Sequence, residues 1–345
     1  MHDLTAEELN SVAVHLRDAG EPPAGPLTAT LFTGGRSNLT YRVDDGVSSW
    51  VLRTPPRRGR TESAHNVRRE YTVMRALVDT DVPVPYPVAL CEDEPVLGVP
   101  FLVTRLVPGH CLQTRVDLGG VDAARLSAIT TALVDALATL HAVDHTKIGL
   151  ADFGRPTGYA QRQIRRWTQQ WSQVGFSALH PLAEELSRSL RDYGFTQDRA
   201  AVVHGDYRID NTLIDLHGSS ASPRIQAIID WELSTIGEPT ADVATMCVYR
   251  HRALDLILGF SSAWTSPRIP DADSLAGVYE RASGRSLRHW DAHVALAYFK
   301  LAVIAAGIDH RHRVGGGHDT GFDKAAEAVP VLLQEGLDRI TAARR

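Results

Sequence analysis

The feature that most constrains the fold is a change in the apolar pattern near residue 105. Before it, short β-type runs dominate, and one segment carries apolar residues at helical spacing. Thr5 and Glu8 form a capping-box pattern at the start of a further, leading helix. We therefore expect a leading helix and a five-stranded sheet with one inserted helix. The expected strands are 27–32, 39–43, 50–53, 84–90 and 101–106, and the inserted helix is 64–78.

After Pro108 and Gly109 the pattern becomes helical, beginning with one apolar face along 126–140. Two short strands interrupt it, and a run of Gly, Ser and Pro at 217–223 predicts the hairpin loop between them. Gly315–Gly317 indicates a flexible loop before the last helix. The further helices are expected near 159–174, 181–193, 241–258, 291–308 and 324–340, and the strands at 212–214 and 225–229.

These patterns together predict a bilobal α+β protein. A small β-rich lobe covers 1–104, a hinge covers 105–108, and a larger helical lobe covers 109–345. A ligand cleft is expected between the two lobes.

Composition excludes several classes of function. The 345 residues are 43% hydrophobic and 22% charged, as in ordinary globular proteins. A formal net charge of −5 gives no broad basic field, so we expect neither a nucleic acid nor a membrane as partner. The three cysteines are far apart, which favours reduced thiols. No basic leader is recognised and no apolar run is expected to span a membrane, so we expect a cytoplasmic protein, either monomer or homodimer.

The polar stretch at 204–211, His-Gly-Asp-Tyr-Arg-Ile-Asp-Asn, carries the expected chemistry. Asp206 precedes Asn211 by five residues, and Asp230 ends a later apolar strand. One carboxylate can orient a hydroxyl and accept its proton, while the amide oxygen and the other carboxylate can hold Mg²⁺. Taken singly, either motif could be a turn or a strand-end cap. A metal-dependent hydrolase would need further His and Asp ligands that this pattern lacks.

The ordered motifs of the chain resemble the aminoglycoside phosphotransferase and choline kinase superfamily, which is related to protein kinases. Beyond the stretch at 204–211, the similarity includes Gly-Gly-Arg-Ser-Asn at 34–38, Val-Leu-Arg at 51–53, Arg-Glu-Tyr at 69–71 and Asp-Trp-Glu-Leu-Ser-Thr at 230–235. These are most similar to the kinase-like domains fused to acyl-CoA dehydrogenases in animals. The resemblance covers about 27–310 and implies a protein-kinase-like fold with ATP and Mg²⁺ as cofactors.

The resemblance also implies roles for residues near the motif. Asp206 becomes the catalytic base, and Asn211 and Asp230 become ligands of Mg²⁺. His204 supports the catalytic loop by hydrogen bonding, and Asp242 braces it, although an acid at a helix N-terminus is the alternative for Asp242. Arg208, inside the loop, could contact substrate or phosphate, or could brace the loop with Asp210.

For the nucleotide, the resemblance implies a glycine-containing turn whose residues Gly35, Arg36, Ser37 and Asn38 approach the phosphates. Family members usually use a lysine on the third strand, but this chain has no lysine before residue 147. Arg53 stands at that position and can bind phosphate bidentately.

Two further positions complete the expected nucleotide site. Glu70 follows Val67 by three residues on the inward helix face, where it can pair with Arg53; an ordinary surface glutamate is the alternative. The hinge includes Arg105 and Val107, and only its backbone is expected to bond the adenine edge.

The acceptor is less constrained by the sequence. Basic clusters at 250–252 and 310–313 would favour an anionic acceptor if they face the cleft, although solvated helix ends are the alternative. The resemblance points to a small-molecule kinase that phosphorylates a hydroxyacyl-CoA or another anionic metabolite. Aminoglycoside or other antibiotic phosphorylation is the alternative within the same class. A pseudokinase scaffold that binds nucleotide is the alternative of another class.

Overall fold

The computed structural model describes residues 4–32, 38–56, 66–197, 199–216, 223–314 and 324–344. The chain forms two compact units. The first unit is Met1–Gly109 with Gln226–Ser234, and the second is His110–Ile225 with Thr235–Arg345. Residues 226–234 therefore belong to the β-rich unit, although the sequence order places them among the helices. The lobe boundaries at 104 and 109 stay a prediction.

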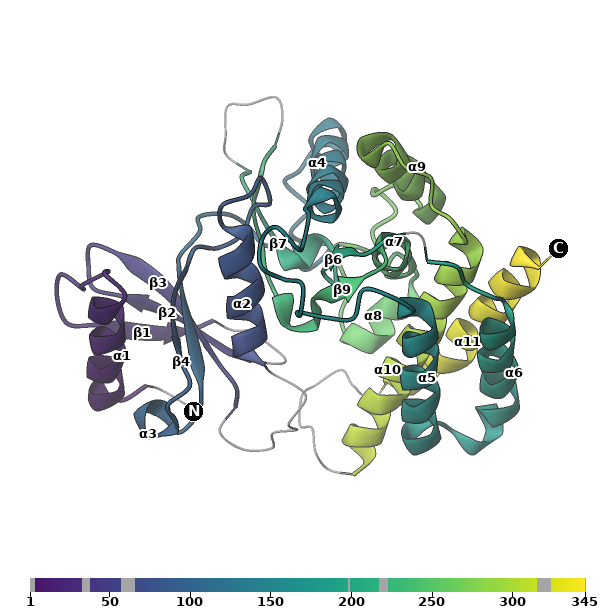
Figure 1. Ribbon diagram of the computed structural model, residues 1–345, viewed down its shortest axis with the longest axis horizontal. Helices are drawn as coiled ribbons and strands as arrows, with labels where there is room; N and C mark the ends of the chain where they lie inside the picture. The colour runs from purple at the N-terminus through teal and green to yellow at the C-terminus, as the bar shows by residue number, and fades with distance from the viewer. Residues whose placement is uncertain are drawn as a thin grey trace. The chain divides into compact units, whose positions relative to one another are not determined.

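The first unit contains the expected five-stranded sheet (Figure 1). All its neighbouring strands pair antiparallel, in the order β1-β2-β3-β5-β4. Along β3 the buried side chains alternate with less buried ones, as one-sided packing of a strand requires. The strands are β1 (Thr28–Leu31), β2 (Leu39–Asp44), β3 (Ser49–Thr54), β4 (Pro87–Cys91) and β5 (Phe101–Arg105).

Helices flank this sheet (Figure 1). The helix α1 (Ala6–Asp18) begins with the expected capping box, and its Val12 and Leu16 join the apolar cluster of one sheet face. The inserted helix α2 (Val67–Leu77) packs against β4 and β5. A short helix α3 (Glu94–Leu97) was not expected from the sequence. The 3₁₀ turn η3 (Trp231–Leu233), which follows Asp230, packs against α2 and so belongs to this unit.

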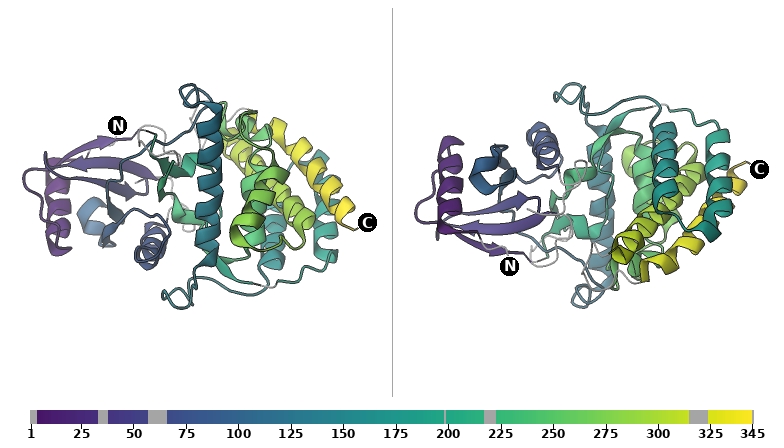
Figure 2. Two further views of the ribbon diagram at one scale, coloured as in Figure 1. Left: turned by 90° about the horizontal axis from the view of Figure 1, so that it is seen from above. Right: turned by 90° about the horizontal axis from the view of Figure 1, so that it is seen from below.

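The second unit is mainly helical (Figure 2). Its long helix α10 is buried along most of its length and packs against α5, α6, α7 and α11. The helices are α4 (Ala123–Ala142), α5 (Tyr159–Val174), α6 (His180–Asp192), α7 (Pro239–Val248), α8 (Ala253–Leu258), α9 (Ala272–Ser283), α10 (Trp290–Arg313) and α11 (Ala325–Ala343), with the 3₁₀ turns η1 (Ser177–Leu179) and η2 (Ile209–Asn211).

Short strands accompany these helices and hold the polar stretch. β6 (Ala201–Val203) pairs antiparallel with β9 (Thr235–Gly237) directly before that stretch. The strands predicted at 212–214 and 225–229 are present as β7 (Thr212–Ile214), in the second unit, and β8 (Ile225–Ile228), which belongs to the first unit from Gln226 on. The predicted loops at 217–223 and 315–317 lie almost wholly outside the described residues.

In the second unit, most of the expected helices are confirmed, with two differences. The expected helix 241–258 is broken into α7 and α8, since turn hydrogen bonds join Arg250 to Cys247 and Leu254 to His251. The helix α9 was missed, although Asp271 caps it by accepting a hydrogen bond from the Ser274 amide.

No apolar run was expected from the sequence to span a membrane, and two helices bear on this expectation. The helices α4 and α10 are both long and apolar enough to cross a membrane. However, much of the most apolar stretch of each helix is buried inside the protein: 72% of it in α10 and 50% in α4. Their apolar side chains therefore fill the core of the second unit, as in core helices of globular proteins.

Candidate active site

The stretch at 204–211 is held by a buried carboxylate. The backbone amides of His204 and Gly205 donate to the two oxygens of Asp242 at 2.7 Å and 2.8 Å. The ring of His141 also contacts Asp242, with 3.2 Å between Nε2 and Oδ2. Gly205 has φ +85°, a conformation that side-chain-bearing residues rarely adopt. The loop is thus fixed by one acid from α7 and by a glycine where the backbone turns.

His204 is a structural part of this loop. Its side chain is fully buried, and its ring lies edge-on to Tyr207 at a centroid distance of 5.6 Å. The backbone amide of Asp206 donates to Nδ1 of His204 at 3.2 Å. These contacts hold the ring of His204 inside the loop, and its supporting role in catalysis stays a prediction.

Asp206 lies among cationic and donor groups. Burial alone would raise the pKa of Asp206, but Arg208, Lys300 and a hydrogen bond from Tyr249 lower it below its ordinary value. The carboxylate is therefore ionised at neutral pH. A carboxylate in this state can accept a hydrogen bond from a substrate hydroxyl and orient it.

Two side chains of the same loop converge on Asp206. Nδ2 of Asn211 donates to the carbonyl and to Oδ2 of Asp206, at 2.7 Å and 3.0 Å. Arg208 lies 3.4 Å from Asp206 and 2.8 Å from Asp210. Arg208 thus pairs with two carboxylates of its own loop, and its contact with substrate or phosphate stays a prediction.

Lys300 was missed by the sequence analysis. It lies on α10, and its ammonium group donates to the carbonyl of Gly205 at 2.7 Å. A signal for it existed, because Lys147, Lys300 and Lys324 are the chain's three lysines among 36 basic residues. A lysine retained in so arginine-rich a chain is a reason to look for a role.

The first unit gathers a second group of charged side chains. Arg53 on β3 lies 3.4 Å from Glu70 and 3.0 Å from Asp230. The expected pairing of Arg53 with Glu70 is therefore present. Glu70 is 1% exposed, which excludes an ordinary surface glutamate. Asn38, also buried, donates to Glu70 at 3.1 Å.

The electrostatics of this group are dominated by burial. Burial would lower the pKa of Arg53, but Glu70 and Asp230 raise it on balance, so the guanidinium stays charged. Burial raises the pKa of Glu70 to about 7, although Arg53 opposes this shift. Asp230 adopts φ 67°, an uncommon backbone conformation for a residue other than glycine.

Three carboxylates of this group could together hold a cation. Oxygens from Glu70, Asp230 and Glu232 all lie within 4.8 Å of one another. Hard oxygen donors of this kind fit Mg²⁺. Glu232 was not among the residues singled out from the sequence, and its position two residues after Asp230 was the available signal.

Of the four residues of the glycine-containing turn that were expected to contact nucleotide, the structure describes only one. Gly35, Arg36 and Ser37 lie outside the described residues. Asn38 is 3% exposed and faces Glu70, so its side chain supports that residue. Asn38 also keeps a buried Oδ1 that has no partner within the described part of the chain.

At the predicted hinge, the structure describes Arg105 and Val107, whose contact with the adenine edge stays a prediction. The side chain of Arg105 is exposed, pairs with Glu21 and lies over the ring of Tyr86, at 4.3 Å from the centroid. The main chain of Val107 forms no hydrogen bond with any other described residue. Its N–H and C=O are therefore available to a planar ligand edge.

Within the basic cluster at 250–252, Arg250 has a structural function. Arg250 donates to four backbone carbonyls, those of Trp264, Ser266, Ile269 and Pro270. Burial lowers its pKa to about 10. In the cluster at 310–313, Arg313 pairs with Asp309 at 2.6 Å. Because the donors of Arg250 are bonded to these carbonyls, Arg250 is not available to bind a phosphoryl acceptor.

Residues 28–296 match the model of the phosphotransferase enzyme family, APH. The chain belongs to this family. The resemblance and the phosphotransferase class expected from the motifs are confirmed.

Curated relatives agree with the branch inferred from the motifs. Acyl-CoA dehydrogenase family member 11 of Rattus norvegicus is 33% identical over 94% of this chain and 41% of its own length. Family member 10 of Mus musculus is 33% identical over 93% of this chain and 30% of its own length. The chain thus spans less than half of these longer relatives.

Solved structures confirm the fold class. A crystal structure of a proposed aminoglycoside phosphotransferase from Ralstonia eutropha JMP134 has a TM-score of 0.81 and 32% identity. It covers 96% of this chain and 98% of that one. A thermostable mutant of aminoglycoside phosphotransferase APH(4)-Ia, solved with AMP-PNP and hygromycin B, has a TM-score of 0.60 and 16% identity, over 94% and 98% of the two chains.

Proposed function

We propose that this phosphotransferase is an ATP- and Mg²⁺-dependent kinase that phosphorylates a hydroxyl of a small anionic metabolite, with a hydroxyacyl-CoA as the leading acceptor. The observation that carries the proposal is Asp206, an ionised carboxylate held on a braced loop. Phosphoryl transfer depends on positioning and on charge neutralisation more than on a covalent nucleophile.

Asp206 orients the acceptor hydroxyl in this proposal. Its lowered pKa makes it a weak base, which suits a loose transition state in which the proton leaves late. Lys300 and Asp242 act through the loop backbone, since both bond to Gly205.

The first unit would hold the nucleotide. The carboxylate of Asp230 would bind Mg²⁺, and Glu232 offers a further oxygen donor. Asn211 stays a proposed Mg²⁺ ligand because of its place in the sequence motif. Bound Mg²⁺ would neutralise charge on the phosphates. Arg53 would contact the phosphates through its guanidinium, and the backbone of Val107 would contact the base.

The class of acceptor is inferred from the relatives. The longer proteins that match this chain are named as acyl-CoA dehydrogenases, and a kinase in the same polypeptide would act on a related acyl-CoA metabolite. An aminoglycoside is the alternative acceptor, favoured by the name of the Ralstonia protein. Polycationic antibiotics need carboxylates at the acceptor site, so the charge of that site separates the two.

ADP release tests the proposal. The complete chain is incubated with ATP and Mg²⁺ against a panel of 3- and 4-hydroxyacyl-CoAs, free hydroxy acids, choline and aminoglycosides. Asp206→Asn should abolish release while leaving the thermal midpoint nearly unchanged. Asp192→Asn, at an exposed position on α6, is the matched control and should retain the wild-type rate.

The outcomes separate the alternatives. Stimulation by a hydroxyacyl-CoA and not by aminoglycosides would support the leading proposal, and the reverse would favour the antibiotic alternative. A chain that binds ATP but releases no ADP with any acceptor, and whose Asp206→Asn variant behaves identically, would contradict the kinase and favour a nucleotide-binding scaffold.

A further inference from the structure

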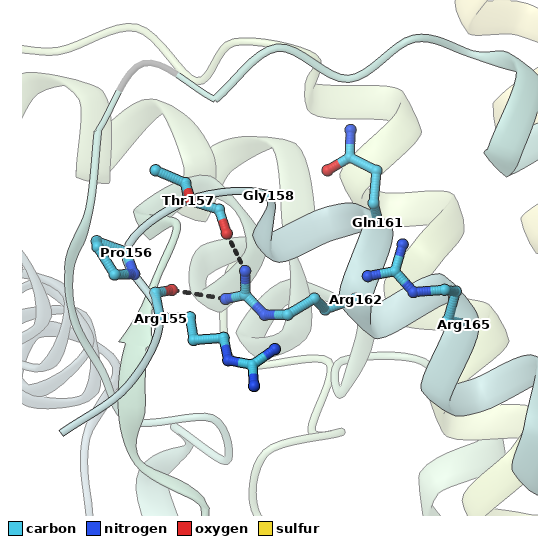
Figure 3. Close-up of a pocket in the computed structure, with 7 residues that line it drawn as sticks. All are labelled: Arg155, Pro156, Thr157, Gly158, Gln161, Arg162 and Arg165. Carbon is cyan, nitrogen blue, oxygen red and sulfur yellow. Dashed lines mark hydrogen bonds between the residues drawn. The ribbon is translucent and has the colours of Figure 1, made fainter. Parts of the chain in front are cut away.

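A cavity in the second unit lies outside the residues discussed so far. It occupies about 480 Å³ where the chain enters α5 (Figure 3). None of its lining residues belongs to the catalytic loop or to the groups that brace it. The lining residues are Arg155, Pro156, Thr157, Gly158, Gln161, Arg162 and Arg165; they are called the arginine pocket below.

The charge of the arginine pocket is strongly positive. It contains three guanidinium groups, and across the described residues none of the three forms an ion pair with a carboxylate. Burial lowers the pKa of Arg162, and the neighbouring charges of Arg155 and Arg165 lower it further. Three like charges around one cavity repel one another unless an anion joins them.

Arg162 gives the pocket a defined shape. Its guanidinium donates to the backbone carbonyls of Arg155, at 2.6 Å, and of Thr157 (Figure 3). These bonds fix the loop that precedes the helix. Arg155 and Arg165 are exposed and form no comparable bond with described residues, so their donors are available to a ligand.

The start of α5 adds backbone donors to the same place. The residue before the helix is Gly158, which has no side chain to cap it. The amide of Tyr159 donates to Gln197 at 3.0 Å, but the amides of Ala160 and Gln161 have no acceptor among the described residues. Open amides and the helix dipole both favour an anion at this end.

The helix that carries the pocket also approaches the catalytic loop. Arg166 lies one turn after Arg162, about 6 Å along the helix axis. Its charge is near enough to lower the pKa of Lys300, which bonds to the Gly205 carbonyl. An extended molecule could therefore present a hydroxyl at the loop and an anionic group at the pocket.

We propose that the arginine pocket binds a phosphate monoester group. Three guanidinium groups and two open amides suit a dianion with several acceptor oxygens. Two sources can supply this chemistry: a phosphate carried by the acceptor, such as the 3′-phosphate of coenzyme A, and free inorganic phosphate. The first source rests on the function proposed above, whereas the pocket itself does not.

Inorganic phosphate tests the pocket alone. Its ³¹P line width is titrated with the complete chain, at constant ionic strength, for the wild type and for Arg155→Gln/Arg165→Gln. The double variant spares Arg162, which shapes the loop. Arg188→Gln/Arg281→Gln removes the same charge from exposed positions on α6 and α9, and is the matched control.

We expect the pocket variant to bind phosphate about tenfold more weakly than the control variant. Equal affinity in the two variants would overturn the proposal. This readout needs no turnover, so it remains decisive even if no kinase activity is found.

Calorimetric titration with coenzyme A and with dephospho-coenzyme A, which lacks the 3′-phosphate, then distinguishes the sources. If the acceptor supplies the phosphate, the pocket variant should lose about tenfold in affinity for coenzyme A and nothing for dephospho-coenzyme A. Loss of phosphate binding without any change for coenzyme A would support the pocket as a site for free phosphate. An equal loss for both coenzymes would contradict recognition of a monoester.

Discussion

Lys300 and Gly205 are joined by a hydrogen bond of 2.7 Å between the ammonium group and the backbone carbonyl. Gly205 also donates its amide to Asp242, so both backbone polar groups of this one residue are bonded to charged side chains from different helices. The next residue is Asp206, whose pKa Lys300 helps to lower. One lysine on α10 thus holds the backbone of this loop and, with Arg208, lowers the pKa of Asp206.

Replacing Lys300 should impair turnover. Lys300→Met removes a charge-assisted hydrogen bond that contributes about 1.5–3 kcal/mol, so we expect kcat/KM to fall by roughly 10- to 100-fold. Loss of the positive charge should also raise the pKa of Asp206 and move the acid limb of the pH–rate profile to higher pH. Steady-state kinetics between pH 4 and 8 measures both effects. If the pH–rate profile of an equally stable variant is unchanged, Lys300 contributes to packing and does not affect the ionisation of Asp206.

Arg53 can be tested by its geometry as well as its charge. Its guanidinium contacts Glu70 and Asp230 together, which an ammonium group cannot reproduce with the same spacing. We expect Arg53→Lys to lower kcat/KM for ATP by about tenfold, and Arg53→Ala by about 100-fold. Arg105→Gln, on the exposed hinge side chain, is the control and should leave the KM for ATP unchanged. If Arg53→Lys kept full activity, the planar guanidinium with its two simultaneous contacts would not be required.

Local patterns explain why much of the fold was predictable. The alternating strands and the capping box of Thr5 and Glu8 leave signals in short windows of sequence. The proposed catalytic motif is equally local, since Asp206 and Asn211 are five residues apart. Glu70 could be placed because helix periodicity puts it on the face of Val67 and Met74.

What could not be predicted depends on contacts between distant segments. Lys300 reaches Gly205 across 95 residues, and no short window links them. Arg250 lies in a run of basic residues that suggested an anion site, yet its donors serve carbonyls 14–20 residues away. The arginine pocket depends on the loop that Arg162 holds, which is invisible in a list of scattered arginines.

Arg250 should therefore matter for stability and not for the acceptor. Arg250→Met leaves four backbone carbonyls without their donor, which we expect to lower the free energy of unfolding by about 2–4 kcal/mol. Arg252→Met, two residues on and exposed, should change it by less than about 0.5 kcal/mol. Urea titration of both variants measures the difference. A fall in acceptor affinity for Arg250→Met at unchanged stability would reverse this interpretation.

Asp242 should stabilise the protein in a pH-dependent way. Burial would raise the pKa of Asp242, but His141 and the amides of the loop lower it on balance. A carboxyl whose pKa is lower in the folded state stabilises that state above its unfolded pKa of about 3.9. This contribution is lost as the pH falls through the lower, folded pKa.

Asp242→Asn should accordingly destabilise the chain most at neutral pH. We expect a loss of about 2–3 kcal/mol at pH 7, since the variant keeps the shape of the side chain but not the charge that accepts the amides of His204 and Gly205. The difference in free energy of unfolding between wild type and variant should stay constant from pH 7 to 5 and become smaller below pH 4. Urea titrations at pH 7, 5 and 3 measure it. If the difference in free energy of unfolding between wild type and variant is equally large at pH 3, Asp242 acts by packing. The charge of its carboxylate would then have no part in holding the loop.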